Sequence, residues 1–514
     1  MRPEAARPAR IVAGGDGLPE QVDLLVVGLG ATGAGVALDA AARGLTVAAV
    51  EARDVAWGTS RFSSKLVHGG LRYLARLQLG VAHESAVERG ILMERTAPHL
   101  TRALPFVLPL TSATGRGREA LAFAGVRAGD LLRRGAGTSP ETLPRPRRIG
   151  VTETLALAPA LRRAGLRGGL LSWDGQLEDD ARLVLCLART AASLGAHVHT
   201  RTRALALTAG GATLRDELTG QVRGIHARAV VNATGVWADR LVPGVRLRPS
   251  RGSHLVVRRS SLPHVRCGLM VPVPGHHNRF VLTLPQPDDT CYIGLTDDAV
   301  DEVPDVPEVP ASDVDFLLAV VNDVLATRLT HADVIGSYAG LRPLLAADGA
   351  TSDLSRKHAV LVSADGVVTV VGGKLTTYRR MAEEAVDRAV EVSGMSAAPC
   401  RTRHLPLLGA APRAELDRVD APARLVRRFG TEAPAVLADA RATTGLPAET
   451  LLAPASTQVP VTLAELVFGV THEGAADVDD LLDRRTRVGL VGADRAVAVP
   501  LAEQALALTG RARA

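Results

Sequence analysis

Cysteine, long apolar runs and a leader-like start are rare or missing in this chain. The four cysteines stand far apart, at positions 186, 267, 291 and 400, and none belongs to a CxxC pair. That spacing argues against a zinc ribbon or an iron–sulfur cluster, so we expect no metal site, and it favours free thiols in a reducing compartment. No apolar run reaches the roughly eighteen residues that a membrane span needs. The first residues also lack the apolar core of a signal peptide, so we expect a cytoplasmic protein.

A strong charge of one sign is lacking too. The chain of 514 residues has 60 basic and 54 acidic side chains, a formal net charge of +6. Arginines gather only in short patches such as RPRR at 145–148, and no basic run is interleaved with aromatic residues. Nucleic acid is therefore not an expected partner. A basic face toward anionic lipid, at the inner face of the cytoplasmic membrane, fits this charge better.

Lysine occurs only three times, at positions 65, 357 and 374, and tyrosine only four times. The segment SSKLVHGGLRYL, residues 63–74, nevertheless contains a lysine, a tyrosine, a histidine and a Gly-Gly pair. A chain that otherwise uses arginine and leucine does not gather these residue types in twelve positions by drift. The composition marks this segment as functional.

One βαβ unit can be read directly from residues 23–52, DLLVVGLGATGAGVALDAAARGLTVAAVEA. Gly28, Gly30 and Gly33 form a GxGxxG pattern at the turn from the first strand into the helix. The first glycine allows a tight turn, the second lets a pyrophosphate approach the backbone, and the third lets helix and strand pack closely. Glu51 ends the second strand, where a carboxylate can accept the ribose hydroxyls. The unit predicts a dinucleotide site.

Two further strand–glycine–helix units follow, RAVVNATGVWADRL at 228–241 and VVTVVGGKLTTYRRMAEEAVDRAV at 367–390. The wide spacing of the three units predicts one domain built from discontinuous segments. Residues 246–300 read as short strands of an antiparallel sheet, and residues 312–330 as an amphipathic helix that begins with a Ser cap. Thr376 and Thr377 are placed to cap the helix that follows them. The chain after Pro406 reads as helical.

Seven motifs occur in a fixed order: GLGATGAG, WGTSRFSSKLVHGGLRYL, LEDDARLVL, VNATGVWAD, RGSHLVV, YAGLRPL and GGKLTTYR. In this order they resemble the FAD-dependent glycerol-3-phosphate dehydrogenase family of the respiratory, aerobic type. The resemblance implies an α/β fold with a discontinuous Rossmann-like FAD-binding domain, an antiparallel-sheet substrate domain and an all-α C-terminal domain. We expect a disordered tail at 1–20, the FAD-binding domain at 21–102, 175–245 and 336–395, the substrate domain at 103–174 and 246–335, and the helical domain at 400–514.

The resemblance implies that FAD accepts a hydride from sn-glycerol 3-phosphate, which becomes dihydroxyacetone phosphate. Electrons then pass to membrane quinone, or to oxygen in the related oxidases. Besides the three glycines and Glu51, the cofactor-binding residues that it implies are Thr59, Ser60, Ser63, Ser64, Lys65, His68, Gly69, Gly70, Ala233, Gly235, Gly372, Gly373, Lys374, Leu375 and Thr376. The helix starts after Gly235 and Gly373 are expected to face the anionic edge of the flavin.

A dianionic phosphate needs at least two cations, and an alcohol that loses a hydride needs a base. Arg342 is the first candidate for the phosphate. Arg72, Tyr73, Arg356 and Lys374 are further substrate-binding candidates, and Arg342 and Lys374 are also counted as catalytic. His254 is the favoured base, because a histidine near its ordinary pKa can accept a proton at pH 7. His68 is the rival.

Several alternatives stay open at this stage. An oxidase that uses oxygen, and an FAD-dependent amine or amino-acid oxidase, share the fold. A non-catalytic Rossmann protein is a third reading. Leu295, which precedes Thr296-Asp297, departs from the Thr-Thr-Asp of the family and leaves room for a different substrate preference. Residues 113–150 match no motif and could face a membrane or an electron acceptor, and the C-terminal helices could form a homodimer.

Overall fold

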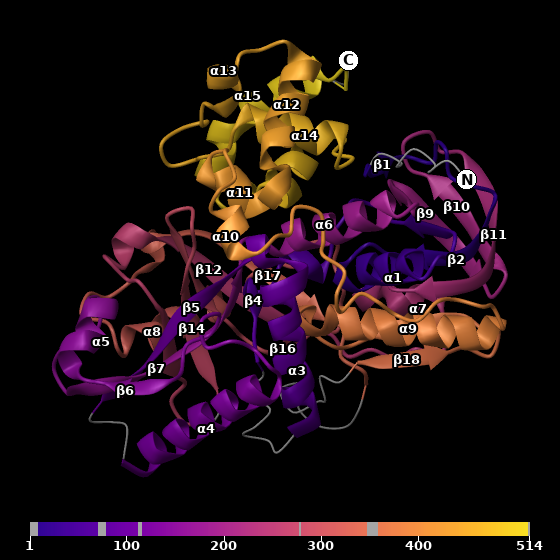
Figure 1. Ribbon diagram of the computed structural model, residues 1–514. Coiled ribbons are helices and arrows are strands. Elements are labelled where there is room, and N and C mark those ends of the chain that lie inside the picture. Colours follow the sequence, from indigo (N-terminus) through magenta and orange to yellow (C-terminus); the bar gives the residue numbers. More distant parts are fainter. Residues whose placement is uncertain (1–8, 70–78, 112–115, 277–278, 347–357, 512–514) are drawn as a thin grey trace.

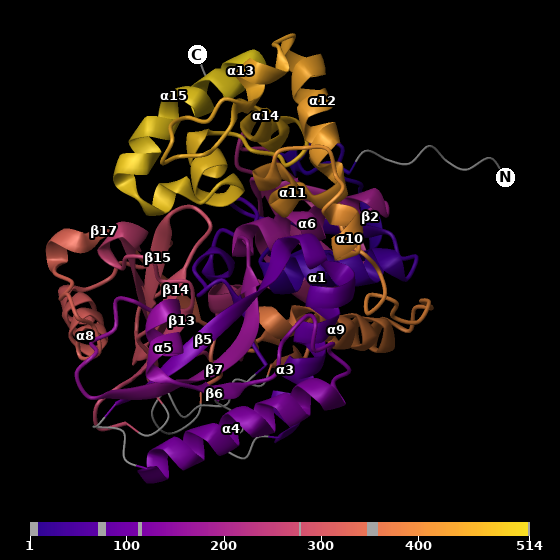
Figure 2. The same ribbon diagram turned by 60° about the vertical axis from the view of Figure 1, so that its left-hand side comes forward.

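The computed structural model describes residues 9–69, 79–111, 116–276, 279–346 and 358–511. Two β-sheets lie side by side, and a unit of short helices at the C-terminal end of the chain sits over one end of both (Figures 1 and 2). The first sheet contains the GxGxxG turn, and the second contains the SHLVV strand.

The first sheet runs in the order β1-β8-β3-β2-β11-β10-β9, and β19 continues it from β11 to β18. Parallel pairing joins β2 to β3 and to β11, and β11 to β19. The strand that ends in NATG, β11, therefore lies beside the first βαβ unit. The strands are β1 Val12–Ala13, β2 Gln21–Val27, β3 Val47–Val50, β8 His197–Thr200, β9 Thr202–Thr208, β10 Gly211–Asp216, β11 Val222–Asn232, β18 Ala359–Val362 and β19 Val368–Val371.

The strand β2 is buried on both faces, as its unbroken apolar run predicts. Leu24 and Val26 point to the face that α1 Ala31–Ala42, α6 Asp180–Ser193 and α9 Tyr378–Ser393 cover. Leu25 and Val27 point to the opposite face, which is packed by β10, β11 and the short helix α7 Ala238–Leu241. Apolar packing on both faces fixes β2 in the sheet, and the glycine turn follows directly at the end of this strand.

The second sheet is largely antiparallel and runs in the order β16-β12-β15-β14-β13-β5-β7-β4, with β17 beside β12 and β6 beside β7. The predicted antiparallel sheet from residues 246–300 is confirmed. The strands are β4 Leu66–Val67, β5 Thr101–Thr111, β6 Arg147–Ile149, β7 Leu166–Leu177, β12 Ser250–Arg258, β13 Gly268–Pro272, β14 Phe280–Pro285, β15 Thr290–Gly294, β16 Asp298–Ala299 and β17 Val334–Arg342.

Alternation along β12 sends its side chains to two different surroundings. Leu255 and Val257 pack in the cluster that α8 Ala311–Asn322 covers, whereas Val256 belongs to the cluster on the opposite face of the sheet. His254 shares the face of Val256. A one-residue slip in register would bury His254 under α8 instead. The remaining helices around this sheet are α3 Leu79–Ile91, α4 Arg116–Gly135 and α5 Val151–Leu157.

The C-terminal unit is helical, as predicted, and has its own apolar core. Its helices are α10 Arg413–Leu416, α11 Ala423–Phe429, α12 Ala433–Thr444, α13 Ala448–Leu452, α14 Leu463–Thr471 and α15 Gly492–Leu508, with the π-helical turn η9 Asp480–Arg485 between the last two. Thr462 and Glu465 form a reciprocal capping box at the start of α14.

Four expectations need correction. The tail does not extend to residue 20, because β1 pairs with β8 and Ile11 is buried against Gly474. The predicted substrate domain ended at residue 335, but β17 belongs to the second sheet. The second stretch of that domain therefore extends to Arg342. Helix α8 ends at Asn322, and its N-cap is Pro310 rather than a serine. Neither the 3₁₀ turn Leu375–Thr377 nor α9 has a side-chain N-cap.

All four cysteines lie in the described part of the chain and are free thiols. Within the same residues, no helix is long and apolar enough to cross a membrane. No group of three or more His, Cys, Asp or Glu side chains in the described ranges is arranged to hold a metal ion.

Candidate functional site

A cavity of about 1610 Å³ opens between the two sheets. Its lining begins at the glycine turn after β2 and reaches the strands β12 and β17 of the second sheet. We call the part around Gly30 and Glu51 the nucleotide end and the part around His254 and Arg342 the substrate end. Glycine backbone positions dominate the nucleotide end, whereas ionisable side chains dominate the substrate end.

The three glycines of the turn have different neighbours. Gly28 adopts φ +99°, and a Cβ on Gly33 would lie 1.8 Å from the carbonyl oxygen of Gly28. These two positions therefore exclude every other residue type for reasons of backbone conformation and packing. Gly33 does not line the cavity, which matches its predicted packing role. Gly30 does line it, and a Cβ there would have only the Ser60 hydroxyl nearby, at 3.1 Å.

Glu51 follows β3 and lines the nucleotide end. Its two carboxylate oxygens accept hydrogen bonds from the backbone N–H of Leu29, at 2.9 Å, and of Arg53, at 3.1 Å. Burial raises the pKa of Glu51, although both N–H donors act in the opposite direction. Glu51 thus fixes the glycine turn to the segment after β3, a bracing role that its position in the sequence did not indicate.

The hydroxyl side chains of residues 59–64 line the cavity and each is held by a different element. Thr59 donates to the Leu341 carbonyl at 2.5 Å, and Ser60 accepts the Ala31 N–H at the start of α1 at 2.9 Å. Ser63 donates its N–H and its hydroxyl to Asp180, at 2.9 and 2.7 Å. The segment therefore connects the first sheet, α6 and β17.

Lys65, which was predicted to contact the cofactor, does not line the cavity. Its side chain is fully buried, its ammonium lies 3.0 Å from Asp180, and it donates to the Arg61 carbonyl at 2.7 Å. The ammonium also lies 4.6 Å from the centre of the Tyr338 ring. A buried ammonium is stable only with such partners. Lys65 therefore anchors the segment that contains Ser63 and Ser64 to α6, on the side of the segment that faces away from the cavity.

His68 lines the cavity, and its backbone N–H donates to the Thr376 hydroxyl at 3.3 Å. Gly69 lies outside the lining: it donates its N–H to Asp174 at 3.1 Å, and a Cβ there would lie 2.5 Å from the Arg89 guanidinium. Close packing against Arg89 by itself accounts for a glycine at this position. Gly70, Arg72, Tyr73 and Arg356 lie outside the described residues.

Arg342 ends β17 and lines the substrate end with a side chain that is 19% exposed. Its guanidinium donates to Asp297 at 3.0 Å, to the Ser250 hydroxyl at 3.1 Å and to the Thr296 carbonyl at 3.2 Å. Asp297 also accepts from Ser250, at 2.5 Å. The guanidinium therefore has one fixed orientation.

The register between β12 and β17 relates Arg342 to His254. Ser250 pairs with Arg342, Gly252 with Gly340, and His254 with Tyr338. A Cβ on Gly252 would lie 2.2 Å from the Arg342 guanidinium, so the guanidinium extends along the strand over Gly252 toward the histidine. Gly252 thus makes room for the guanidinium and Gly340 for Phe62, and both glycines line the cavity between the cation and the imidazole.

His254 is 2% exposed and its ring stacks on Tyr338, with centroids 4.7 Å apart. Nε2 lies 2.8 Å from the Ser64 hydroxyl, and Nδ1 has no hydrogen-bond partner among the described residues. A Cβ on Gly294 would lie 2.3 Å from the ring, so that glycine makes room for it. Burial and the charges of Lys65 and Arg342 lower the pKa of His254 well below its ordinary value, which leaves the ring neutral at pH 7.

Lys374 lines the same cavity and donates to the Ser85 hydroxyl at 2.5 Å. The other predicted residues of this segment, 372, 373, 375 and 376, line the cavity too, as do Ala233 and Gly235. The helices expected after Gly235 and Gly373 each begin with a 3₁₀ turn: Gly235–Trp237 continues directly into α7, and Leu375–Thr377 into α9.

Other lining residues were missed or given no role. Trp57 and Trp237 both line the cavity, and a Cβ on Gly58 would lie 2.8 Å from the Trp237 ring. Asp180 anchors Ser63 and Lys65, and Asp297 orients Arg342. The signals were present, since Asp180 lies in the quoted LEDD motif and two of the three tryptophans adjoin glycine motifs. The sequence could not show that Asp180 pairs with Lys65 or that Asp297 pairs with Arg342.

The cavity fits a flavin adenine dinucleotide. The middle glycine of the turn leaves a gap beside the start of α1, where backbone N–H groups attract a pyrophosphate. The Nε1 atoms of Trp57 and Trp237 are buried and have no hydrogen-bond partner in the described part of the chain. The volume exceeds the roughly 300–1,000 Å³ of common ligand sites. It therefore accommodates a dinucleotide together with a small substrate.

Comparison with known proteins agrees with this geometry. The model of the family described as "FAD dependent oxidoreductase" matches residues 23–379, and that of the "C-terminal domain of alpha-glycerophosphate oxidase" matches residues 400–510. Glycerol-3-phosphate dehydrogenase 1 of Mycobacterium tuberculosis is 51% identical over 511 residues, which are 98% of each chain. The aerobic glycerol-3-phosphate dehydrogenase of Staphylococcus aureus is 34% identical over 76% of this chain and 71% of its own.

Among solved structures, the glycerol-3-phosphate dehydrogenase from Bacillus halodurans complexed with FAD has a TM-score of 0.71 at 29% identity, covering 96% of this chain and 93% of its own. The L-alpha-glycerophosphate oxidase from Mycoplasma pneumoniae shares the fold, with a TM-score of 0.56 at 18% identity over 75% of this chain and 98% of its own.

Proposed function

The chain belongs to the family of FAD-dependent oxidoreductases, and on that premise we propose that it oxidises sn-glycerol 3-phosphate to dihydroxyacetone phosphate and passes the electrons to membrane quinone. The observation that carries the proposal is the substrate end of the cavity. There a guanidinium with one fixed orientation and a neutral imidazole lie on the same face of two paired strands. FAD, when bound, supplies the acceptor for the hydride that leaves C2 of the substrate.

Arg342 binds the phosphate of the substrate in this proposal. A planar guanidinium makes two parallel hydrogen bonds to phosphate oxygens, and Asp297 and Ser250 prevent it from turning away. Lys374 lines the same cavity and adds a second cation. The Ser250 and Thr296 contacts stabilise the orientation without adding negative charge, whereas Asp297 offsets part of the charge of Arg342.

His254 removes the proton from the C2 hydroxyl. The ring is neutral at pH 7, and its stacking on Tyr338 keeps it in one plane. The proton goes to Nε2, directly or through the Ser64 hydroxyl that lies 2.8 Å away. Burial of the ring excludes water, so the proton is taken from the substrate rather than from solvent.

The route to quinone is proposed from α4. Its exposed face contains Leu121 and Leu131, with side chains 71% and 65% exposed, and the exposed Arg127 and Arg134. Leu121 also lines the cavity. An apolar strip bordered by arginines suits the interface of an anionic membrane, where quinone is dissolved. We place the protein as a peripheral protein on the inner face of the cytoplasmic membrane, and a homodimer remains a prediction.

Flavin absorbance under anaerobic conditions tests the substrate. The bound flavin should bleach on addition of sn-glycerol 3-phosphate and not with glycerol, simple amines or amino acids. Bleaching by an amino acid instead would replace the proposal with an amino-acid oxidase. Reoxidation by a quinone analogue faster than by air would support the dehydrogenase, and the reverse would indicate an oxidase.

Vesicle flotation tests the membrane contact. The protein should float with vesicles of phosphatidylglycerol and not with phosphatidylcholine. The double variant L121E/L131E should bind at least about tenfold more weakly, because each lost leucine forfeits the burial of at least one CH₂ group, about 0.8 kcal/mol. Leu205→Glu, at an exposed position on β9, is the matched control. Equal binding by the double variant and the wild type would remove α4 from the proposal.

A further inference from the structure

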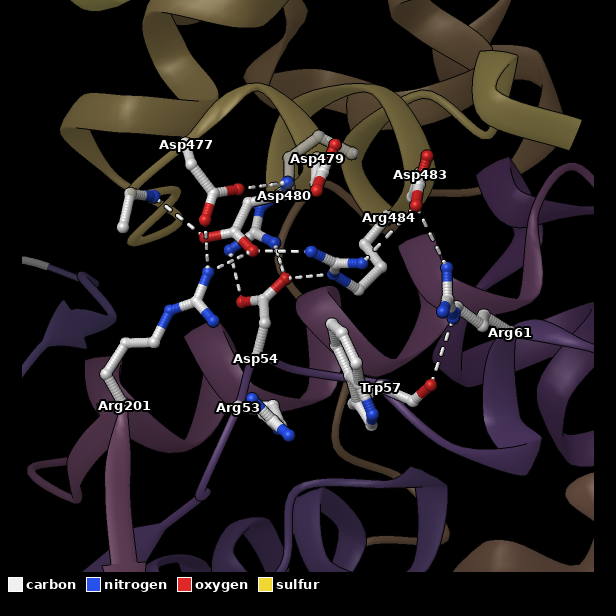
Figure 3. Close-up of polar contacts among 12 residues, drawn as sticks. Arg53, Asp54, Trp57, Arg61, Arg201, Asp477, Asp479, Asp480, Asp483 and Arg484 are labelled. Carbon is white, nitrogen blue, oxygen red and sulfur yellow. Dashed lines mark hydrogen bonds and ion pairs between the residues drawn. The ribbon is translucent and has the colours of Figure 1, made fainter. Parts of the chain in front are cut away.

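A buried cluster of charges joins the C-terminal helices to the segment that follows β3 (Figure 3). That segment, residues 51–62, includes Glu51, Trp57, Thr59 and Ser60 of the nucleotide end. Asp54 lies within the segment but does not line the cavity, and it points toward the C-terminal helices instead. We call the charged residues around it the Asp54 cluster: Asp54, Arg201, Asp477, Asp480, Arg484 and Arg485.

Asp54 is fully buried and is held by two arginines of η9. Arg484 donates to its Oδ2 at 2.5 Å, and Arg485 donates to both of its oxygens, at 2.9 Å to Oδ1. Burial alone would raise the pKa of Asp54, yet Arg485 and Arg484 hold it below its ordinary value. The carboxylate is therefore charged and almost fully satisfied by groups far away in the sequence.

The cluster continues on the other side of Arg484. Arg484 also contacts Asp480 at 2.5 Å, and Arg201, just after β8, contacts Asp480 and Asp477 at 2.7 Å each. Asp54 and Arg201 come from the first sheet, whereas the remaining members come from the C-terminal unit. Each side thus supplies charges of both signs, so the cluster closes only when the two parts are together.

Trp57 links the cluster to the cavity. The Arg484 guanidinium lies 4.9 Å and the Arg61 guanidinium 5.2 Å from the centre of its ring. Arg61 in turn contacts Asp483 of η9 at 3.3 Å and donates to the Trp57 carbonyl at 3.0 Å. A ring that lines the nucleotide end is therefore packed against three arginines, since Arg53 also lies 5.5 Å from its centre, and Arg61 and Arg484 pair with carboxylates of the C-terminal unit.

We infer that the C-terminal unit holds the segment 51–62 in the shape that binds FAD, with Asp54, Arg484 and Arg485 as positioning residues for the cofactor. The segment has little regular structure, only the 3₁₀ turn Thr59–Arg61, so ordering it costs conformational entropy. The Asp54 cluster supplies that order before FAD arrives, and a pre-ordered site binds more tightly. The inference concerns retention of the cofactor and is independent of the substrate.

The variant Asp54→Asn tests the inference in the full-length protein. It keeps the shape of the side chain and removes the charge that η9 binds. The matched control is Glu473→Gln, which breaks the equally buried pair that Glu473 forms with Arg182 of α6 at the same interface. Neither Arg182 nor Glu473 lines the cavity. Each variant removes the carboxylate that a buried arginine binds, Arg485 in Asp54→Asn and Arg182 in Glu473→Gln, so we expect a comparable loss of thermal stability.

Three readouts separate positioning from general stability: the FAD dissociation constant by fluorescence titration, the melting temperature of the apoprotein, and hydrogen exchange of residues 53–62. Asp54→Asn should raise the FAD dissociation constant by about tenfold or more, a change of about 1.4 kcal/mol. It should also speed exchange in the segment. Glu473→Gln should leave both within about twofold. Equal effects of the two variants, or an unchanged dissociation constant in Asp54→Asn, would overturn the inference.

Asp483→Asn covers the case in which Asp54→Asn does not fold. Its side chain is 27% exposed and its main contact in the segment is Arg61, so the fold should tolerate the change. The FAD dissociation constant should rise by about threefold, in line with the small free energy of a partly exposed ion pair. An unchanged dissociation constant together with unchanged exchange in residues 53–62 would count against the inference.

Discussion

The two ends of the cavity are built in opposite ways. At the nucleotide end the essential features are backbone shape and missing side chains, as at Gly28, Gly30 and Gly33. At the substrate end they are ionisable side chains held by partners from other strands, as Asp297 holds Arg342. A cofactor that stays bound can be held by many neutral contacts, whereas a small anion that must come and go requires a few well-oriented charges.

Removal of the cation at the substrate end should have the largest effect. Arg342→Ala should lower kcat/KM for sn-glycerol 3-phosphate by about a thousandfold, because a charged contact of about 4 kcal/mol is lost and Asp297 keeps its negative charge. Steady-state kinetics with an artificial acceptor measure the change. FAD content should stay at the wild-type level, since the nucleotide end is untouched.

Arg251→Ala is the control for that variant. Arg251 lies on the same strand, β12, and pairs with Asp313 at 3.3 Å, but it does not line the cavity. Its kcat/KM should stay within about threefold of the wild type. A similar loss in both variants would show that strand stability, rather than phosphate binding, sets the rate.

Replacement of the base should have the second largest effect. His254→Asn should lower kcat by about a hundredfold, the lower end of the range for acid–base catalysis. The lowered pKa of His254 means that the base form predominates at pH 7 and is lost only as the pH falls through that pKa. The wild-type rate should therefore fall in acid with an apparent pKa below 6.5, and the variant should lose this acid limb.

His68→Asn distinguishes the rival base. His68 also lines the cavity, where its backbone N–H donates to the Thr376 hydroxyl. The variant should keep the acid limb of the pH–rate profile. Retention of the limb in His254→Asn and its loss in His68→Asn would exchange the roles of the two histidines.

A side chain at the middle glycine should have the smallest of these effects and should act only at the nucleotide end. Gly30→Val places atoms where the pyrophosphate is expected while meeting only the Ser60 hydroxyl. The FAD dissociation constant should rise by about thirtyfold, or about 2 kcal/mol. Isothermal titration of the apoprotein gives the value. Gly224→Val, on β11 with no neighbour within 4 Å of its Cβ, should leave FAD binding unchanged.

Much of the nucleotide end could be predicted from the sequence because its determinants are local. The turn at Gly28–Gly33 needs certain backbone angles and close approaches, and those requirements are visible in the residue types. The alternation in SHLVV likewise indicates a strand with two different faces. Glu51, at the end of the second strand, lines the nucleotide end, and its contact with the ribose stays a prediction.

The substrate end was predictable only in part. The candidates Arg342, His254 and Lys374 line one cavity, but their partners Asp297, Ser64 and Ser85 are set by the register between strands and by helix packing. Lys65 shows the limit most clearly. Its rarity suggested chemistry, whereas its side chain is buried against Asp180. Rarity indicates that a residue matters and does not indicate on which side of the backbone it acts.

A crystal structure of the holoenzyme with sn-glycerol 3-phosphate, soaked after anaerobic reduction of the flavin, is the measurement that decides most. We predict that the ADP half of FAD lies between Gly30 and Glu51. We predict equally that the phosphate of the substrate contacts the Arg342 guanidinium, with the C2 hydroxyl within hydrogen-bond distance of His254. A phosphate bound away from Arg342, or a cofactor that reaches neither Gly30 nor Glu51, would contradict this assignment of the two ends.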